Sequence, residues 1–430
     1  MTHNPIITKV TAKLDDLYKW LEDAGHTHIL AVCDNNTAGF AHQVKAKLDN
    51  DQLLTLSPSP GDVDLVPDER AIDKIFAAVE IYQTIYKMDH KSMALIAVGS
   101  GSICDLTRYV ASKLGLSYYV VATAASMDGY TSTVTAPVIG NLKQTYPADA
   151  PAGVLADPDM YSDAPALLTA AGFGDIMGKF TSITDWEMEG RLGMDGYCKI
   201  LSDEMHQITL ECFKAKTPVS IMGALIDSGL VMQKAGHSRP AAGAEHHLSH
   251  HWEMMALMEG KPPALHGAKV GVATLVVLQA QEWLVEQDIT DATWARAEEL
   301  AKNFDVSAWH DDLRRCYSHA AEEVIKDWPN ENSATRLALL KSIRDNWPAL
   351  KALLSENIGL HPQIEAAIAD MGGPTTPASL GVGRDVFVSG IHHANRLRVR
   401  FTVWRLLDLL GLLPEYAERL ADAYFGCRGD

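Results

Sequence analysis

The feature that most limits the fold is an alternation of short apolar segments with helix-like stretches in the N-terminal part of the chain. The apolar segments have the character of buried strands and lie at residues 28–33 (HILAVC), 53–56, 94–98 (ALIAV) and 116–122 (LSYYVVA). Helical periodicity separates them at residues 38–49, 69–89 and in the stretch that ends at Leu114. This β-α-β-α-β succession predicts a mostly parallel sheet with helices on both faces.

The pattern changes after the last of these segments. Residues 133–158 contain five punctuating residues, Pro137, Gly140, Pro147, Pro151 and Pro158, which predict a hairpin and one further strand in VLAD. From Asp163 onward nearly all apolar residues recur with helical spacing, at 175–190, 200–215, 219–235, 270–287, 291–303, 310–327, 334–354, 362–370 and 395–425. We therefore predict an α/β domain with a parallel sheet at residues 1–162 and an all-α domain at residues 163–430.

The charge balance limits the partners of the chain. Its 430 residues include 37 Lys and Arg against 55 Asp and Glu, a formal net charge of −18. Such a surface disfavours nucleic acid and anionic membranes, so an anionic ligand needs a local positive site. We expect no membrane insertion, because no uncharged apolar run reaches the roughly 20 residues of a membrane span.

The cysteines and the N-terminus indicate the compartment. The six cysteines are scattered without a CxxC pair, at positions 33, 104, 198, 212, 316 and 427. In a chain of this size this favours free thiols in a reducing compartment. The first residues, MTHNPIITKV, are too polar for a signal peptide, so we expect a cytoplasmic protein.

A small-residue turn lies between an expected strand and an expected helix. It reads Gly99-Ser100-Gly101-Ser102-Ile103-Cys104-Asp105. Small residues let the backbone approach a phosphate, and the helix N-terminus offers free N–H groups. The dinucleotide pattern GxGxxG is incomplete, since its third glycine position holds Cys104, and an ordinary tight turn stays an alternative. The position after a central strand favours the ligand site.

Two further segments contain polar groups near glycines. Thr123-Ala124-Ala125-Ser126-Met127-Asp128-Gly129-Tyr130-Thr131-Ser132 follows the next strand, so it lies on the same rim of the sheet and could hold a ribose and a polar substrate, or be only a capped loop. Gly172-Phe173-Gly174-Asp175-Ile176-Met177-Gly178-Lys179 opens or interrupts a helix. Asp175 and Lys179 share a helix face, which suits a solvated ion pair, but the glycines indicate close packing.

The histidine-rich segment is the strongest chemical signal. It reads Glu245-His246-His247-Leu248-Ser249-His250-His251 and is followed by Leu265-His266-Gly267. The pairs His246/His250 and His247/His251 each have the i,i+4 spacing of one helix face. Imidazole nitrogens suit zinc, nickel or iron, and a carboxylate with two histidines leaves positions open for a substrate. The spacing differs from HExxH, and it does not select which histidines bind.

Taken in order, these four motifs resemble those of the sn-glycerol-1-phosphate dehydrogenases. This family lies in the superfamily of iron-type alcohol dehydrogenases, glycerol dehydrogenases and dehydroquinate synthases. The resemblance runs from about residue 25 to the C-terminus and is greatest to the longer bacterial (AraM-like) branch, partly through the tail FTVWRLLDLLGLL. It implies an NAD(P)-binding Rossmann-like domain, a helical metal- and substrate-binding domain, a divalent metal and a homodimer.

The resemblance also implies roles for individual residues. The cofactor contacts are Gly99, Ser100, Gly101, Ser102, Ile103, Thr123, Ala124, Ala125, Ser126 and Ser132. The metal ligands are Asp175, His246 and His266, with zinc or nickel ahead of iron. Asp128, Asp175 and His250 contact the substrate, and Asp175 and His250 are the catalytic residues. His247 and His251 are bystanders.

The activity that the resemblance implies is the reduction of dihydroxyacetone phosphate, a small phosphorylated ketone, to sn-glycerol 1-phosphate by NADH or NADPH. Three departures from the family pattern are Ser100 in place of the usual middle glycine, Ala122 in place of a frequent proline, and a longer segment between His250 and His266. Three alternatives remain open. They are a glycerol or iron-type alcohol dehydrogenase with an unphosphorylated substrate, a dehydroquinate-synthase-like cyclase, whose Lys- and Arg-rich phosphate pocket is not evident, and a metal-binding module without catalysis.

Overall fold

The computed structural model describes residues 8–46, 48, 51–58, 65–87, 90–139, 142–143 and 146–426. The chain forms two compact units. The first comprises residues 1–176 and 210–237, and the second comprises residues 177–209 and 238–430. The units are defined by compactness, whereas the expected division after residue 162 marks a change in secondary-structure type and stays a prediction.

The first unit is built on a parallel sheet of six strands in the order β1-β10-β5-β4-β2-β3. The strands are β1 (Lys9–Thr11), β2 (His28–Asp34), β3 (Asp51–Leu56), β4 (Met93–Gly99), β5 (Ser117–Ala122) and β10 (Gly153–Leu155). β3 lies on one side of β2 and β4 on the other, so the strand order reverses between β2 and β4. Ligands of open α/β sheets bind at such a switch point, outside the carboxyl ends of the strands.

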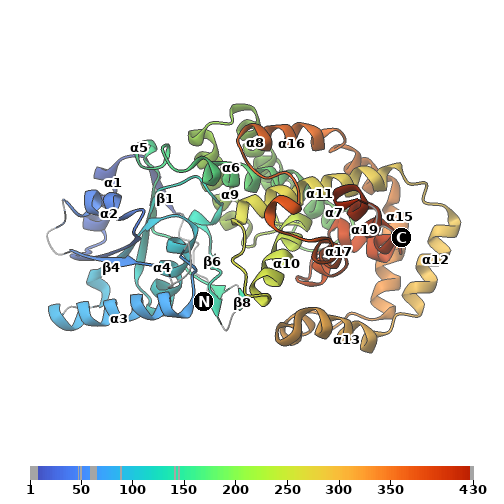
Figure 1. Ribbon diagram of the computed structural model, residues 1–430, viewed down its shortest axis with the longest axis horizontal. Helices are drawn as coiled ribbons and strands as arrows, with labels where there is room; N and C mark the ends of the chain where they lie inside the picture. Colours follow the sequence, from blue (N-terminus) through green and yellow to red (C-terminus); the bar gives the residue numbers. More distant parts are fainter. Residues whose placement is uncertain are drawn as a thin grey trace. The chain divides into compact units, whose positions relative to one another are not determined.

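Helices cover both faces of this sheet (Figure 1). α1 (Leu14–Asp23) and α2 (Ala38–Lys45) pack on one face, where Leu17, Leu21 and Val44 join alternate strand residues such as Ile29 and Ile96 in one core. α3 (Glu69–Tyr86) and α4 (Gly101–Leu114) lie on the other face. α4 contacts β4 and β5 directly. The four inner strands, β2, β4, β5 and β10, are buried on both faces, which is why they appear as continuous apolar runs in the sequence.

The remaining elements of the first unit are short strands and additional helices. Two small hairpins pair β6 (Val134–Thr135) with β9 (Tyr146–Pro147) and β7 (Val138–Ile139) with β8 (Leu142–Lys143). The helices are α5 (Pro158–Tyr161), α6 (Ala166–Met177) and α9 (Pro218–Ala235), and α6 continues into the second unit at its last residue. β1 and α1 were not expected, because β1 is a three-residue edge strand without an apolar run.

Within its described residues, the second unit is helical. α7 (Lys179–Arg191), α10 (Ala244–Met258), α11 (His266–Glu286), α12 (Asp291–Lys302), α15 (Ser333–Ser355), α17 (Arg384–His393), α18 (Val403–Leu409) and α19 (Leu413–Phe425) contribute to one core. The other helices of this unit are α13 (Val306–Tyr317), α14 (Ala321–Lys326) and α16 (Leu360–Asp370), and α8 (Lys199–Ala215) belongs to it up to Thr209 and to the first unit from Leu210. α11 is buried on all sides, as expected of a helix that is apolar on every face.

The expected fold class is confirmed, with differences in helix boundaries. Residues 310–327 were expected to form one helix, but α13 ends at Tyr317 because Ser318 has a positive φ of 47° that an α-helix cannot contain. The stretch 395–425 is divided between α18 and α19. Residues 47, 49, 88, 89, 140 and 427, which are part of expected helices, turns or the cysteine set, lie outside the described residues.

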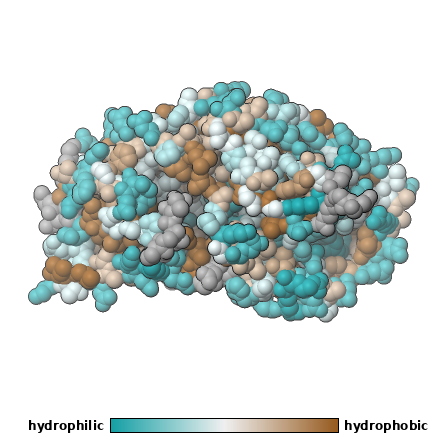
Figure 2. Space-filling view, viewed as in Figure 1, coloured by the Kyte–Doolittle hydropathy of each residue, from teal (hydrophilic) through white to brown (hydrophobic). Residues whose placement is uncertain are grey.

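The hydrophilic character of the surface agrees with the many charged residues of the sequence. Figure 2 shows a face on which hydrophilic residues predominate and hydrophobic ones form small scattered groups. Among the helices of the described residues, not one has the length and apolar content that crossing a bilayer requires.

Candidate active site

The turn after β4 has two glycines with different structural requirements. A Cβ on Gly99 would lie 2.6 Å from the Cβ of Ile103, so the fold itself requires a glycine there. A Cβ on Gly101 would only meet Met127 Cγ at 3.6 Å, which is ordinary contact. Packing therefore does not explain Gly101, the first residue of α4, whereas a ligand that approaches the helix N-terminus would.

The turn is bonded to the segment after β5. The amide of Thr123 donates to the carbonyl of Gly99 at 3.2 Å, and the hydroxyls of Ser100 and Ser126 lie 2.6 Å apart. The Ser100 hydroxyl also accepts from the Gly101 amide at 2.7 Å. Ser100, the departure from the family pattern, thus connects the two loops. The ten expected cofactor residues lie at the end of β4 and in the first turn of α4, in the segment after β5, and at Ser132 after the short helix of residues 129–131, while their role stays a prediction.

Arg108 holds the loop that carries Asp128 and Ser132. Its guanidinium is 1% exposed and donates to the carbonyls of Gly129 and Val134, the latter at 2.8 Å, and to the Tyr118 hydroxyl at 3.1 Å. Because Arg108 belongs to α4, the helix after the glycine turn, it couples the position of the turn to that of this loop. Arg108 was not expected from the sequence, since an arginine within an amphipathic helix looks like a surface residue.

Two helix glycines let helices approach these loops. A Cβ on Gly172 in α6 would overlap the carbonyl oxygen of Ala125 and lie 2.7 Å from its carbon. A Cβ on Gly229 in α9 would overlap the hydroxyl of Thr131. The close packing expected from the glycines of residues 172–178 is therefore present, at Gly172.

Asp175 lies three residues further along α6 and is fully buried. One of its carboxylate oxygens accepts from the Asp128 amide at 3.0 Å. Lys179, the first residue of α7, is also fully buried. The solvated ion pair considered for these two residues is therefore wrong, because neither side chain reaches water. A buried carboxylate has to be hydrogen-bonded, paired or bound to a metal.

Three histidines of the second unit lie close together. The ring centroid of His246 is 5.4 Å from that of His266 and 6.3 Å from that of His250, and those of His250 and His266 are 5.9 Å apart. His266 is the first residue of α11, so α10 and α11 each place histidines in this group. The side chain of His250 is 28% exposed, whereas that of His246 is 7% exposed.

Asp175, His246 and His266 form a group that could hold a metal ion. Each offers one ligand atom, and the three atoms lie within 4.8 Å of one another. This is the one such group of three or more His, Cys, Asp or Glu residues among the described parts of the chain. One carboxylate and two imidazoles are donors that suit zinc, nickel or iron.

The other two histidines of the segment are packed inside the second unit. His247 is 2% and His251 0% exposed. His251 Nδ1 lies 2.9 Å from the Tyr317 hydroxyl, and its ring stacks on His393. Burial lowers the pKa of His251 to about 3 and that of His247 well below its ordinary value, with Arg400 as a further cause for His247. Both rings are therefore neutral at physiological pH.

Buried carboxylates surround the start of α10. Glu245 and Asp185 are 0% and 3% exposed, and Asp185 accepts from the amides of Ala244 and Val403 at 2.7 and 2.9 Å. Burial first and the nearby Glu245 second raise the pKa of Asp185 well above its usual value. Burial opposes ionisation of Glu245 too, but its bonds to His246 and Gly243 prevail and lower its pKa. Asp185 was not expected from the sequence, because it is one of many acids in helical segments.

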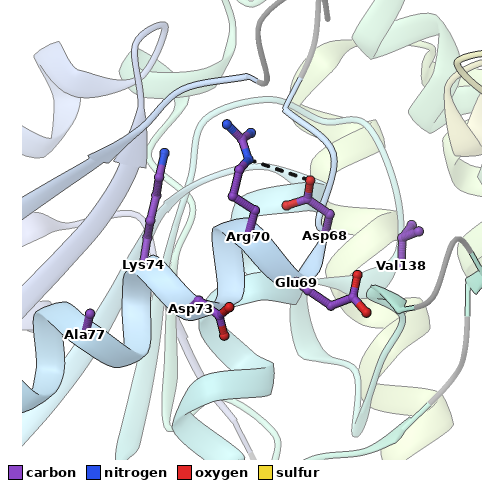
Figure 3. A pocket seen from close by; sticks show the side chains of 7 residues that line it. All are labelled: Asp68, Glu69, Arg70, Asp73, Lys74, Ala77 and Val138. Carbon is purple, nitrogen blue, oxygen red and sulfur yellow. Dashed lines mark ion pairs between the residues drawn. The ribbon is translucent and has the colours of Figure 1, made fainter.

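A surface pocket of about 650 Å³ lies at the N-terminus of α3 (Figure 3). Its lining is Asp68, Glu69, Arg70, Asp73, Lys74, Ala77 and Val138. Arg70 pairs with Asp68 at 3.8 Å, and Asp68 also caps α3 by accepting from the Ala71 amide at 2.9 Å. These charges serve the helix terminus, and the pocket contains none of the expected site residues.

Comparisons with known proteins show which family the sequence is similar to. A family model described as iron-containing alcohol dehydrogenase matches residues 11–165. A glycerol-1-phosphate dehydrogenase [NAD(P)+] of Halalkalibacterium halodurans is 35% identical over 406 residues, which cover 91% of this chain and 89% of the relative. Another of the same name, from Geobacillus thermodenitrificans, is 30% identical and covers 92% and 90%.

Solved structures support the fold. The structure of a probable glycerol dehydrogenase from Sinorhizobium meliloti 1021 superimposes with a TM-score of 0.55 at 16% identity and covers 96% of this chain and 97% of that one. At this identity the likeness concerns the architecture alone, and it agrees with a parallel α/β domain followed by helices. The sequence relatives carry the assignment further: the chain belongs to the glycerol-1-phosphate dehydrogenase [NAD(P)+] family.

Proposed function

We propose that this chain interconverts dihydroxyacetone phosphate and sn-glycerol 1-phosphate with NAD(P) and a divalent metal. In the reducing direction the ketone, NAD(P)H and a proton give the secondary alcohol and NAD(P)+. The observation that carries the proposal is the group of Asp175, His246 and His266, in a chain whose relatives of 30–35% identity carry the name of this activity.

The three residues would hold the metal through one carboxylate oxygen and two ring nitrogens. When bound, the metal would supply a Lewis acid for the ketone oxygen and the nicotinamide a hydride. The carboxylate of Asp175 contributes the negative charge of the ligand set. The Asp128 amide, which donates to it, fixes its orientation.

His250 would exchange a proton with the substrate oxygen. Its ring lies about as far from His266 as from His246, yet its side chain stays the more exposed of the two on α10. A partly exposed imidazole can pass a proton to water, which a fully buried one cannot. Asp128 would contact the substrate from the loop that Arg108 holds.

The glycine turn supports the nucleotide. Gly99, Ser100, Gly101, Ser102 and Ile103 would hold the pyrophosphate at the start of α4. Thr123, Ala124, Ala125, Ser126 and Ser132 would extend along the nicotinamide half. The proposed fit of the pyrophosphate rests on Gly101. The protein's own packing does not require a glycine at this position, and the missing side chain leaves the backbone accessible to a ligand.

Zinc and nickel are the proposed metals, with iron as the third candidate because the matching family model is described as iron-containing. We also propose a cytoplasmic homodimer. The cytoplasmic location is supported by the cysteines at 33, 104, 198, 212 and 316, all those in the described residues, which are free thiols. The dimer is what the family resemblance implies. Light scattering of the purified protein tests the dimer, and a mass of one chain refutes it.

The decisive assay is NAD(P)H oxidation with dihydroxyacetone phosphate after metal stripping and separate addition of Zn²⁺, Ni²⁺ and Fe²⁺. We expect activity only with added metal, and we expect the product to be sn-glycerol 1-phosphate and not its enantiomer. His266→Ala should lose turnover and bound metal, whereas His310→Ala, which changes a half-buried histidine of α13, should keep both. Turnover of glycerol or another unphosphorylated polyol alone would refute the substrate, and full activity of His266→Ala would refute the ligand set.

A further inference from the structure

Glu245 has a contact that its place in the motif does not explain. It is the second residue of α10, and neighbours in a helix normally point apart. Here the carboxylate turns toward the next residue, and its Oε1 lies 2.8 Å from Nδ1 of His246. Both side chains are buried, at 0% and 7% exposure, so water does not compete for this bond.

Both oxygens of Glu245 are held in place by the protein. Oε1 also accepts from the Gly243 amide at 2.6 Å, and Oε2 accepts from the Thr181 hydroxyl at 2.7 Å. Thr181 belongs to α7, so two helices fix the carboxylate. A side chain that is bonded at both oxygens cannot rotate away without breaking three hydrogen bonds in a buried site.

This arrangement determines which nitrogen of His246 carries the proton. Oε1 already accepts from the Gly243 amide, so its contact with His246 favours the tautomer in which Nδ1 is the donor. The lone pair of the neutral ring then lies on Nε2, the nitrogen on the opposite edge. A carboxylate behind a metal-binding histidine fixes its tautomer and orientation and raises its basicity.

We propose that Glu245 is a positioning residue for the metal centre: it presents Nε2 of His246 as the ligand atom and thereby raises the affinity for a divalent cation. The inference rests on the proposed function, because it assumes that His246 is a ligand. It goes beyond that proposal in two ways: it names Nε2 as the ligand atom of His246, and it gives the carboxylate of Glu245 a supporting role behind that ligand.

A purely structural role is the competing explanation, because Glu245 also bonds the amide of Gly243 at the start of α10. Asp185 offers a matched control. It is a buried carboxylate in the same network and accepts from two amides, those of Ala244 and Val403, but it contacts none of the proposed ligands in any bond described above. Asp185→Asn therefore perturbs the same helix start and leaves the bond to His246 intact.

The test measures Zn²⁺ affinity of the metal-stripped full-length protein by competition with a chromophoric chelator, beside the thermal stability of the metal-free form. We expect Glu245→Ala to weaken Zn²⁺ binding 10- to 100-fold, in the range known for such partners. Glu245→Gln should retain more affinity, since its amide oxygen still accepts from Nδ1. Asp185→Asn should lower the melting temperature and leave the Zn²⁺ affinity within about twofold, because the ligand partners that set the affinity are untouched.

Two outcomes overturn the inference. One is wild-type Zn²⁺ affinity in Glu245→Ala, and the other is an equal loss of affinity in Asp185→Asn, which would make the effect one of helix stability. His246→Ala and His266→Ala separate this from the proposed function. If both lose Zn²⁺ and Glu245→Ala does not, only the role of Glu245 is wrong. If neither loses Zn²⁺, the ligand set and this inference both fall.

Discussion

Gly172→Ala tests whether α6 is positioned by direct contact with the backbone of the loop after β5. An alanine has a higher helix propensity than glycine by about 1 kcal/mol, so local structure alone predicts stabilisation. In the structure, the added Cβ would lie 2.7 Å from the carbonyl carbon of Ala125 and overlap its oxygen. Carbon atoms pack at about 3.5–4.0 Å, so helix or loop has to move by about 1 Å.

The sign of the expected stability change follows from comparing the cost of overpacking with the gain in helix propensity. Overpacking of this kind costs typically 1–3 kcal/mol and the neighbour is backbone, which cannot rotate away, so the upper part of that range applies. After the gain in propensity, we expect a net destabilisation of about 1–2 kcal/mol and a fall in melting temperature of roughly 3–6 °C. The dinucleotide affinity should fall as well, because Ala125 belongs to the expected cofactor segment.

Gly223→Ala is the matched control. Gly223 lies inside α9, in the same unit, and a Cβ there would meet nothing within 4 Å. The identical substitution should therefore raise the melting temperature by up to about 4 °C, as propensity alone dictates. Thermal unfolding by circular dichroism and dinucleotide titration by fluorescence give the answer. A Gly172→Ala variant as stable as the wild type, or an equal fall in Gly223→Ala, would refute the reasoning.

Three further predictions concern single side chains. Ser100→Ala removes the bond to Ser126 and a cap of α4, so it should cost about 1 kcal/mol and weaken dinucleotide binding; unchanged binding and stability contradict this. Arg108→Met leaves buried carbonyls unpaired and should lower the free energy of unfolding by roughly 3 kcal/mol, measured by denaturant unfolding. An unchanged free energy of unfolding would show that the guanidinium is dispensable. His251 binds a proton only near pH 3 when folded but near 6.5 when unfolded, so it destabilises the fold progressively as the pH falls below 6.5. At pH 5 this amounts to roughly 2 kcal/mol, and His251→Gln should unfold with a correspondingly weaker pH dependence between pH 7 and 5. Parallel pH profiles of the two proteins would contradict it.

The sheet could be predicted because its inner strands are buried on both faces and therefore appear as uninterrupted apolar runs. The same logic failed for β1, which is a short edge strand with two exposed residues. A helix boundary was missed at Ser318, where a single residue with positive φ divides an expected helix. Nothing in a serine signals that backbone conformation. Arg108, Asp185 and the contact of Glu245 were not foreseen, because a charged residue in a helical segment is expected at the surface.

For the candidate site, local spacing determined that His246 and His250 share one helix face and that His247 and His251 share another. Spacing could not choose between the faces, because each i,i+4 pair satisfies it equally. The tertiary structure buries His247 and His251 against the second unit's own helices and brings His246 near His266, the first residue of another helix. It also places Asp175, 71 residues before His246 in the sequence, within reach of both rings. A repeat within one helix specifies which residues share a face, whereas the packing of other helices decides what that face meets.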